Sequence, residues 1–226
     1  MIRIANGKIE TPMTLKENSP LSLVIENPAE FYRTVTALLA SFEGEESEFT
    51  FWDDAKEFKP SEKGEAVCNL FSFGSADKKI ISLLYKRLYA EFLAGDFLLA
   101  YNELGAAAER FLLSLFEKTD IPLTYEAPSP EEFFKFYSVK PVKDEESLLE
   151  KLISYVNVFA ELKNVSFLVF VGLKAVLRVE DLERFYRHCE LYKVSLMLIE
   201  SERKKSLKEE RTIIITEDLC EIVENF

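Results

Sequence analysis

The C-terminal third of the chain constrains the fold most, because two apolar segments there bracket one amphipathic segment. Residues 165–171 and 194–199 are short apolar runs typical of strands that are buried on both faces of a sheet. Between them, residues 179–192 carry apolar side chains at helical spacing. A strand, a crossover helix and a parallel strand form the building unit of open α/β sheets. A further apolar run at 211–216 predicts another strand of the same sheet.

The first 71 residues also carry strand signals. An Asn-Gly pair at positions 6–7, between alternating apolar residues, predicts a β-hairpin. The apolar segment 21–26 predicts a strand, and the Asn-Pro pair at 27–28 predicts that a helix begins directly after it. That helix is expected to continue towards residue 42. Two further strands are predicted, at 49–52 and 66–71.

The pattern becomes helical between residues 74 and 163. Long helices are predicted at 80–99, 101–117, 131–137 and 145–162. We therefore predict an α/β protein with a mainly parallel sheet and an inserted helical domain. The predicted α/β head is discontinuous and comprises 1–73 and 164–226, and the predicted helical leg comprises 74–163.

Composition bounds the class of protein. With 226 residues, of which 48% are hydrophobic and 19 are Phe, the chain can bury a sizeable core. Its apolar runs fall short of the roughly 20 residues that span a bilayer, and its first residues lack the apolar core of a signal peptide. Three scattered cysteines fit free thiols in a reducing compartment. We expect a cytoplasmic protein that does not enter a membrane.

The motifs of common enzymes are absent from the sequence. No GxxxxGK[ST] or GxSxG segment occurs, and the loop after the strand at 21–26 offers neither a glycine nor a lysine for phosphates. The single histidine, His188, neighbours Cys189 on a predicted helix, where adjacent side chains point about 100° apart. Asp53, Asp54, Glu57 and Lys59 resemble a metal-dependent nuclease cluster, but their spacing is too short. We expect no catalytic residue and no enzymatic activity.

The net charge of −12 argues against a simple nucleic-acid binder, although an acidic chain can carry a local basic surface. Two groups of cations stand out, one at the start of the first long helix and one in the loop after the strand at 194–199. Loops at strand carboxyl ends are where open parallel sheets place ligands. The alternative is that both groups are ordinary solvated surface. The cations are Lys78, Lys79, Lys86, Arg87, Arg203, Lys204, Lys205 and Lys208.

Three carboxylates flank a turn at Ile121-Pro122. They belong to Glu117, Asp120 and Glu126. Calcium and similar hard cations favour oxygen ligands offered from irregular backbone, so these residues are candidate metal ligands, although the segment is no EF-hand.

Taken in order, these segments resemble the short-form CRISPR type II-A spacer-acquisition proteins, a family of DNA-binding ring proteins. The resemblance covers nearly the whole chain in the order of its elements. It rests on 23–26 entering a helix, on 48–53 with Lys59, and on three segments near the end of the chain. Those segments are 163–171, 196–200 and 215–222.

The resemblance implies a head like that of P-loop ATPases without the nucleotide site, and a helical leg. It further implies a homotetrameric ring that encircles double-stranded DNA, supports the CRISPR integrase and effector proteins, and does not cut DNA. Lys78, Lys79, Lys86, Arg87 and Lys204 would line the hole. Lys59, Arg203, Lys205 and Lys208 would be further DNA-binding residues. Calcium would order the ring, although Pro122 and Thr124 occupy places where the family carries acidic ligands, which leaves Glu117, Asp120 and Glu126.

Two other functions fit the sequence. One is a protein-interaction scaffold of the acquisition complex that does not itself bind DNA, because the many Phe residues supply apolar surface and the acidic balance suits a basic partner. The other is a degenerate nucleotide-binding enzyme, whose melting temperature should respond to ATP and magnesium.

Overall fold

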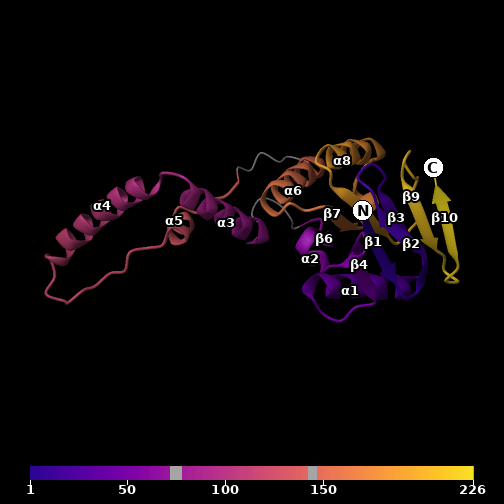
Figure 1. Ribbon diagram of the computed structural model, residues 1–226, viewed down its shortest axis with the longest axis horizontal. Coiled ribbons are helices and arrows are strands. Elements are labelled where there is room, and N and C mark those ends of the chain that lie inside the picture. Colours follow the sequence, from indigo (N-terminus) through magenta and orange to yellow (C-terminus); the bar gives the residue numbers. More distant parts are fainter. Residues whose placement is uncertain (72–77, 142–146, 226) are drawn as a thin grey trace. The chain divides into compact units, whose positions relative to one another are not determined.

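The computed structural model describes residues 1–71, 78–141 and 147–225, and it divides into two compact units. The first unit comprises Met1–Gly74 and Lys143–Phe226, and the second comprises Ser75–Val142. Figure 1 shows the elements of each. The α/β class with a mainly parallel sheet is confirmed in the first unit.

A six-stranded sheet forms the centre of the first unit, in the order β10-β9-β3-β8-β7-β6 (Figure 1). Its strands are β3 (Leu21–Ile25), β6 (Gly64–Val67), β7 (Phe167–Val171), β8 (Ser195–Glu200), β9 (Arg211–Ile215) and β10 (Glu221–Asn225). Every neighbouring pair is parallel except β9 and β10. The predicted unit of strand, helix and parallel strand is confirmed as β7, α8 (Val179–Leu191) and β8.

A second sheet, wholly antiparallel, has four strands in the order β2-β1-β4-β5. Its strands are β1 (Ile2–Asn6), β2 (Ile9–Leu15), β4 (Phe49–Asp53) and β5 (Lys56–Glu57). The predicted hairpin is confirmed, with Asn6 opposite Ile9 across the turn. The sequence predicted the hairpin and the strand at 49–52 separately. It did not predict that they pair in one sheet, because no local pattern indicates this pairing.

The helices of this unit are α1 (Pro28–Glu43), α2 (Pro60–Lys63), α6 (Leu148–Lys163), α7 (Leu173–Val176) and α8. Helices α6 and α8 cover one face of the six-stranded sheet, and the second sheet together with helix α1 covers the other. Alternate side chains of β7 show the two layers. Phe167 and Val169 belong to the core shared with β1, β4 and α1, whereas the Phe170 ring meets the Phe185 ring of α8.

Helix α6 belongs to the first unit, whereas the sequence placed 74–163 together in the leg. The physical reason is burial, because α6 packs against α8 and five of its side chains are buried in the first unit. These are Leu149, Leu152, Tyr155, Val156 and Phe159. At its end, Lys163 Nζ donates to the Gly64 carbonyl at 3.0 Å and holds the helix to β6. The predicted boundary at 73–74 and the predicted helix start at 145 lie outside the described residues.

The second unit is helical, with α3 (Lys78–Ala94), α4 (Leu98–Phe116) and α5 (Pro130–Phe136). Helix α3 contacts α5, and aromatic rings of Phe92, Tyr101 and Phe133 join the three helices. Helix α4 buries none of its residues. Among the described residues, no helix is long and apolar enough to cross a membrane.

The Phe167 ring lies directly on Gly64, its partner across the β6–β7 pair. A Cβ atom at position 64 would stand 2.3 Å from Phe167 Cζ, although the backbone there is ordinary extended chain. The ring cannot withdraw, because Phe42, Phe51 and Phe58 surround it with centroids about 6 Å away. Gly64 is therefore required by packing.

The substitution Gly64→Ala should lower the free energy of unfolding by about 1–3 kcal/mol, because the added methyl group overpacks a fixed aromatic cluster. Denaturant unfolding followed by circular dichroism measures the decrease. Gly7→Ala is the matched control in the same unit, since a Cβ atom there has no neighbour within 4 Å. Equal stability of the two variants would show that the Phe167 ring can move aside.

Candidate nucleic-acid interface

A groove in the second unit lies between α3 and α5, and most of the charged side chains that line it are positive. Figure 1 labels the two helices. The volume of the groove is about 590 Å³. Four lysines line it, with one carboxylate, that of Glu131. The lysines are Lys78, Lys86, Lys135 and Lys140.

Local sequence explains how the groove forms. On α3, the lining positions recur at the spacing of one helix face, from Lys78 to Tyr85 and Lys86. Helix α5 starts at a capping box formed by Ser129 and Glu132. It ends where Ser138 adopts a left-handed conformation (φ 50°) and the Val139 N–H bonds the Phe134 carbonyl at 3.0 Å. This turn directs Val139 and the following lysine to the groove.

The four lysines make no ion pair with any residue that the structure describes. Each is exposed, so their ammonium groups repel one another across the groove and attract polyanions. The other predicted cations of α3 contribute less. Arg87 pairs with Glu91 at 2.6 Å, and Lys79 does not line the groove.

The remaining predicted cations lie in the first unit. Lys59 is exposed at the start of α2, beside Lys56, Lys63 and two glutamates. In the loop between β8 and β9, Arg203 pairs with Glu224 and Lys204 with Glu202. Lys205 and Lys208 are exposed in the same loop. The structure thus brings only Lys78 and Lys86 of the predicted set into one groove.

A buried ion pair holds the end of this β8–β9 loop. The Lys174 ammonium of α7 pairs with the Glu210 carboxylate, and their side chains are 3% and 0% exposed. Glu210 also accepts the Leu207 N–H at 3.3 Å and the Tyr186 hydroxyl at 3.3 Å. Burial raises the pKa of Tyr186 well above its usual value, so the phenol stays a donor.

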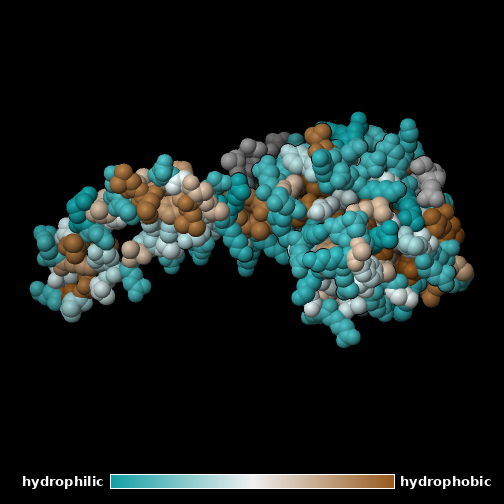
Figure 2. All heavy atoms as spheres, in the orientation of Figure 1, coloured by the Kyte–Doolittle hydropathy of each residue, from teal (hydrophilic) through white to brown (hydrophobic). Residues whose placement is uncertain are grey.

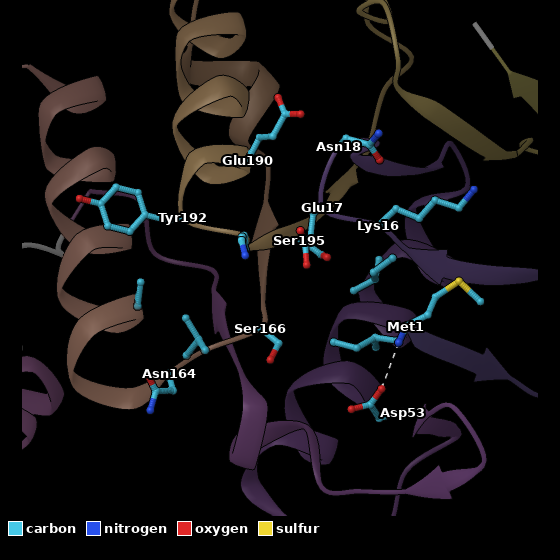
Figure 3. Close-up of a pocket in the computed structure, with 15 residues that line it drawn as sticks. Met1, Lys16, Glu17, Asn18, Asp53, Asn164, Ser166, Glu190, Tyr192 and Ser195 are labelled. Atoms are coloured by element: carbon cyan, nitrogen blue, oxygen red, sulfur yellow. Dashed lines mark hydrogen bonds and ion pairs between the residues drawn. The ribbon is translucent and has the colours of Figure 1, made fainter.

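A pocket of the first unit has different chemistry (Figure 3). It measures about 930 Å³ and lies where β7 and β8 begin, with Ser166 and Ser195 in its wall. Its two lysines are accompanied by Glu17, Asp53 and Glu190. This mixed lining does not favour a polyanion, and it lies at the opposite sheet edge from the one where open parallel sheets bind ligands.

The candidate metal ligands are not brought together in the described part of the chain. No group of three or more His, Cys, Asp or Glu side chains lies close enough there to hold a metal ion, so Glu117, Asp120 and Glu126 form no ready calcium site in one chain. Asp53, from the nuclease-like segment, accepts a hydrogen bond from Lys63 Nζ. The His188 ring bonds the Asn157 amide oxygen at 2.7 Å, linking α8 to α6.

Sequence reasoning missed Lys135 and Lys140, half of the groove's positive charge. Lys135 lies within a short aromatic helix and Lys140 follows it, and neither stands beside another cation in the sequence. The sequence pattern that could have indicated them is the pair Glu131 and Lys135. These residues are four positions apart, so both charged side chains lie on the same face of α5. Only the contact between α3 and α5 shows that this face meets Lys78 and Lys86.

Comparison with known proteins gives one family and one fold. Residues 41–219 match the family model described as CRISPR-associated protein (Cas_Csn2). No curated protein matches the chain. Among solved structures, the crystal structure of Stu0660 of Streptococcus thermophilus is similar, with a TM-score of 0.64 and 14% identity. That match covers 100% of this chain and 76% of the other, and at this identity it shows the fold alone.

Replacing Lys174 by Met should destabilise the protein by about 3–5 kcal/mol, because it leaves the Glu210 carboxylate buried without a countercharge. Unfolding by denaturant at neutral pH measures the effect. The double variant Lys174→Met/Glu210→Gln should recover most of the stability, since the uncompensated charge of Glu210 is then removed. A double variant as unstable as the single one would show that packing, and not charge, governs this site.

Proposed function

Because the chain belongs to the Csn2 family of CRISPR-associated proteins, we propose that it is a non-catalytic double-stranded DNA-binding protein supporting spacer acquisition in type II-A CRISPR immunity. The observation that carries the proposal is the groove between α3 and α5, whose four lysines have no ion-pair partner among the described residues. DNA phosphates would neutralise these ammonium groups and release counterions. Binding would therefore be independent of sequence and strongly weakened by salt.

The proposal includes a homotetrameric ring around the DNA, in which the six-stranded unit acts as a P-loop-ATPase-like head without a nucleotide site. Helix α4 supports self-association, because its apolar side chains lie at the surface. Figure 2 shows hydrophobic side chains in brown over this helix. Phe97, Leu104, Phe111 and Leu115 are exposed and recur at spacings of seven and four, which form one stripe. Integrase and effector proteins of the same system would be its partners.

Charge reversal in the groove tests DNA binding. The double variant Lys86→Glu/Lys135→Glu should lower the affinity for blunt duplex DNA at least about tenfold. It should also reduce the slope of log affinity against log salt by about 0.9 for each phosphate that the protein no longer neutralises. Fluorescence anisotropy at several salt concentrations measures both quantities.

The control is Lys118→Glu, which makes half of this charge change, on an exposed lysine of the same unit outside the groove. Its affinity should stay within about twofold of the parent protein. A groove variant that binds duplex as tightly as the parent would contradict the proposed DNA-binding face.

Self-association through α4 predicts that Leu104→Glu/Phe111→Glu reduces the oligomer to a smaller species, because two charges would be buried at the interface. Light scattering, with and without calcium, measures the mass and tests the calcium expectation at the same time. Asn102→Asp, on the opposite side of α4, should leave the oligomer unchanged. A monomeric parent protein in both conditions would remove the ring from the proposal.

The exposed apolar stripe also favours a second candidate, a protein-interaction scaffold without DNA binding of its own. In that case the parent protein would fail to retain duplex even at low salt. The α4 variant would no longer bind an acquisition protein, whereas the groove variant would bind it normally.

A further inference from the structure

The groove between α3 and α5 has an apolar floor as well as a basic rim. Ile81, Tyr85 and Val139 line it between the lysines, and Ser82 and Ser138 also line it. Phosphate binding requires only cations and hydrogen-bond donors. The apolar floor therefore needs another explanation than binding to the backbone of a duplex.

The size of the groove limits what can occupy it. A volume of about 590 Å³ falls within the range of about 300–1,000 Å³ that is typical of pockets for small ligands. One or two nucleotides of a single strand fit such a space. In a duplex the base faces are stacked on one another and cannot reach the floor, so only the outer phosphates would meet the lysines.

We propose that this groove binds unpaired nucleotides at the end of a DNA duplex, with phosphates on the lysine rim and a base on the Tyr85 ring. Single-stranded nucleic acids are bound in this manner elsewhere, by a positive groove combined with an aromatic platform. The inference rests on the proposed function, because it assigns a further ligand to the same DNA-binding surface.

The Tyr85 ring is fixed before any ligand arrives. Its hydroxyl donates to the Phe134 carbonyl at 3.4 Å, and its ring stands 6.1 Å from the Phe134 ring, centroid to centroid. A ring held in this way loses little freedom when a base stacks on it. The Glu131 carboxylate in the same wall is an acceptor suited to the exocyclic amino groups of cytosine and adenine.

The test compares one duplex in two forms, blunt and with a short unpaired tail, using the full-length protein. We expect the tail to increase the affinity about tenfold, the effect of stacking one base on an aromatic side chain. A 2-aminopurine in the tail should lose fluorescence on binding, because stacking quenches it. Equal affinity for both DNAs with unchanged fluorescence would overturn this inference.

Two variants locate the effect. Tyr85→Leu keeps an apolar side chain in the floor but removes the ring, so blunt and tailed duplex should bind this variant with equal affinity. Phe136→Ala is the control and should keep the tenfold preference for the tail, because Phe136 is 81% exposed on α5 and does not line the groove. Melting curves of both variants confirm that they are folded.

The outcomes separate this inference from the function on which it rests. Binding to blunt duplex without any gain from a tail overturns the inference alone. Failure to bind either DNA overturns the proposed function as well, and would assign the exposed aromatic and apolar surface to a protein partner. Disappearance of the tail effect in Phe136→Ala but not in Tyr85→Leu would overturn the groove as the base-binding surface.

Discussion

The packing of Phe167 on Gly64 is central to the first unit, because the six-stranded sheet, the antiparallel sheet and helix α1 meet there. Gly64 lies in β6 and Phe167 in β7, so their packing joins the chain before the helical unit to the chain after it. The ring also stacks on Phe51 of the antiparallel sheet, with centroids 5.8 Å apart, and meets Phe42 of α1. Without this packing, the edge strand β6 would depend on its backbone hydrogen bonds to β7 and on the Lys163 side chain at the end of α6. The aromatic cluster therefore stabilises the pairing of β6 with β7, which a long helical insertion separates in the sequence.

The local arrangement of charged side chains in this protein differs from what its net charge suggests. The whole chain carries −12, yet four lysines and one glutamate line a groove of the second unit, and these lysines form no ion pair within the described part of the chain. In the first unit, by contrast, several cations beside the six-stranded sheet have carboxylate partners, as Arg203, Lys163 and Lys174 do. Paired charges stabilise a fold or its loops, whereas unpaired charges of one sign attract a ligand. Net charge alone is therefore a poor guide to what this groove can bind.

Sequence patterns predicted the elements better than their partners. The β7–α8–β8 unit, the first hairpin and the Asn27 cap were all predictable, because each depends on neighbours along the chain. The predicted strand at 66–71 is shorter in the structure and ends at Val67. The place of α6 and the part that Lys135 and Lys140 play in the groove could not be predicted, because helical periodicity shows that a face is apolar or charged but not what it meets. The sequence therefore predicted two of the four lysines of the candidate site, Lys78 and Lys86.

The position of β3 at the centre of the six-stranded sheet has a consequence for biosynthesis. Both of its neighbours, β8 and β9, come from the last third of the chain. Pairings so distant in sequence form slowly, because a long loop must close before they can stabilise anything. During translation β3 therefore leaves the ribosome with two open hydrogen-bonding edges and waits for most of the polypeptide to follow. Such an edge can pair with another chain, so early termination of synthesis would yield an aggregation-prone fragment and not a smaller folded domain.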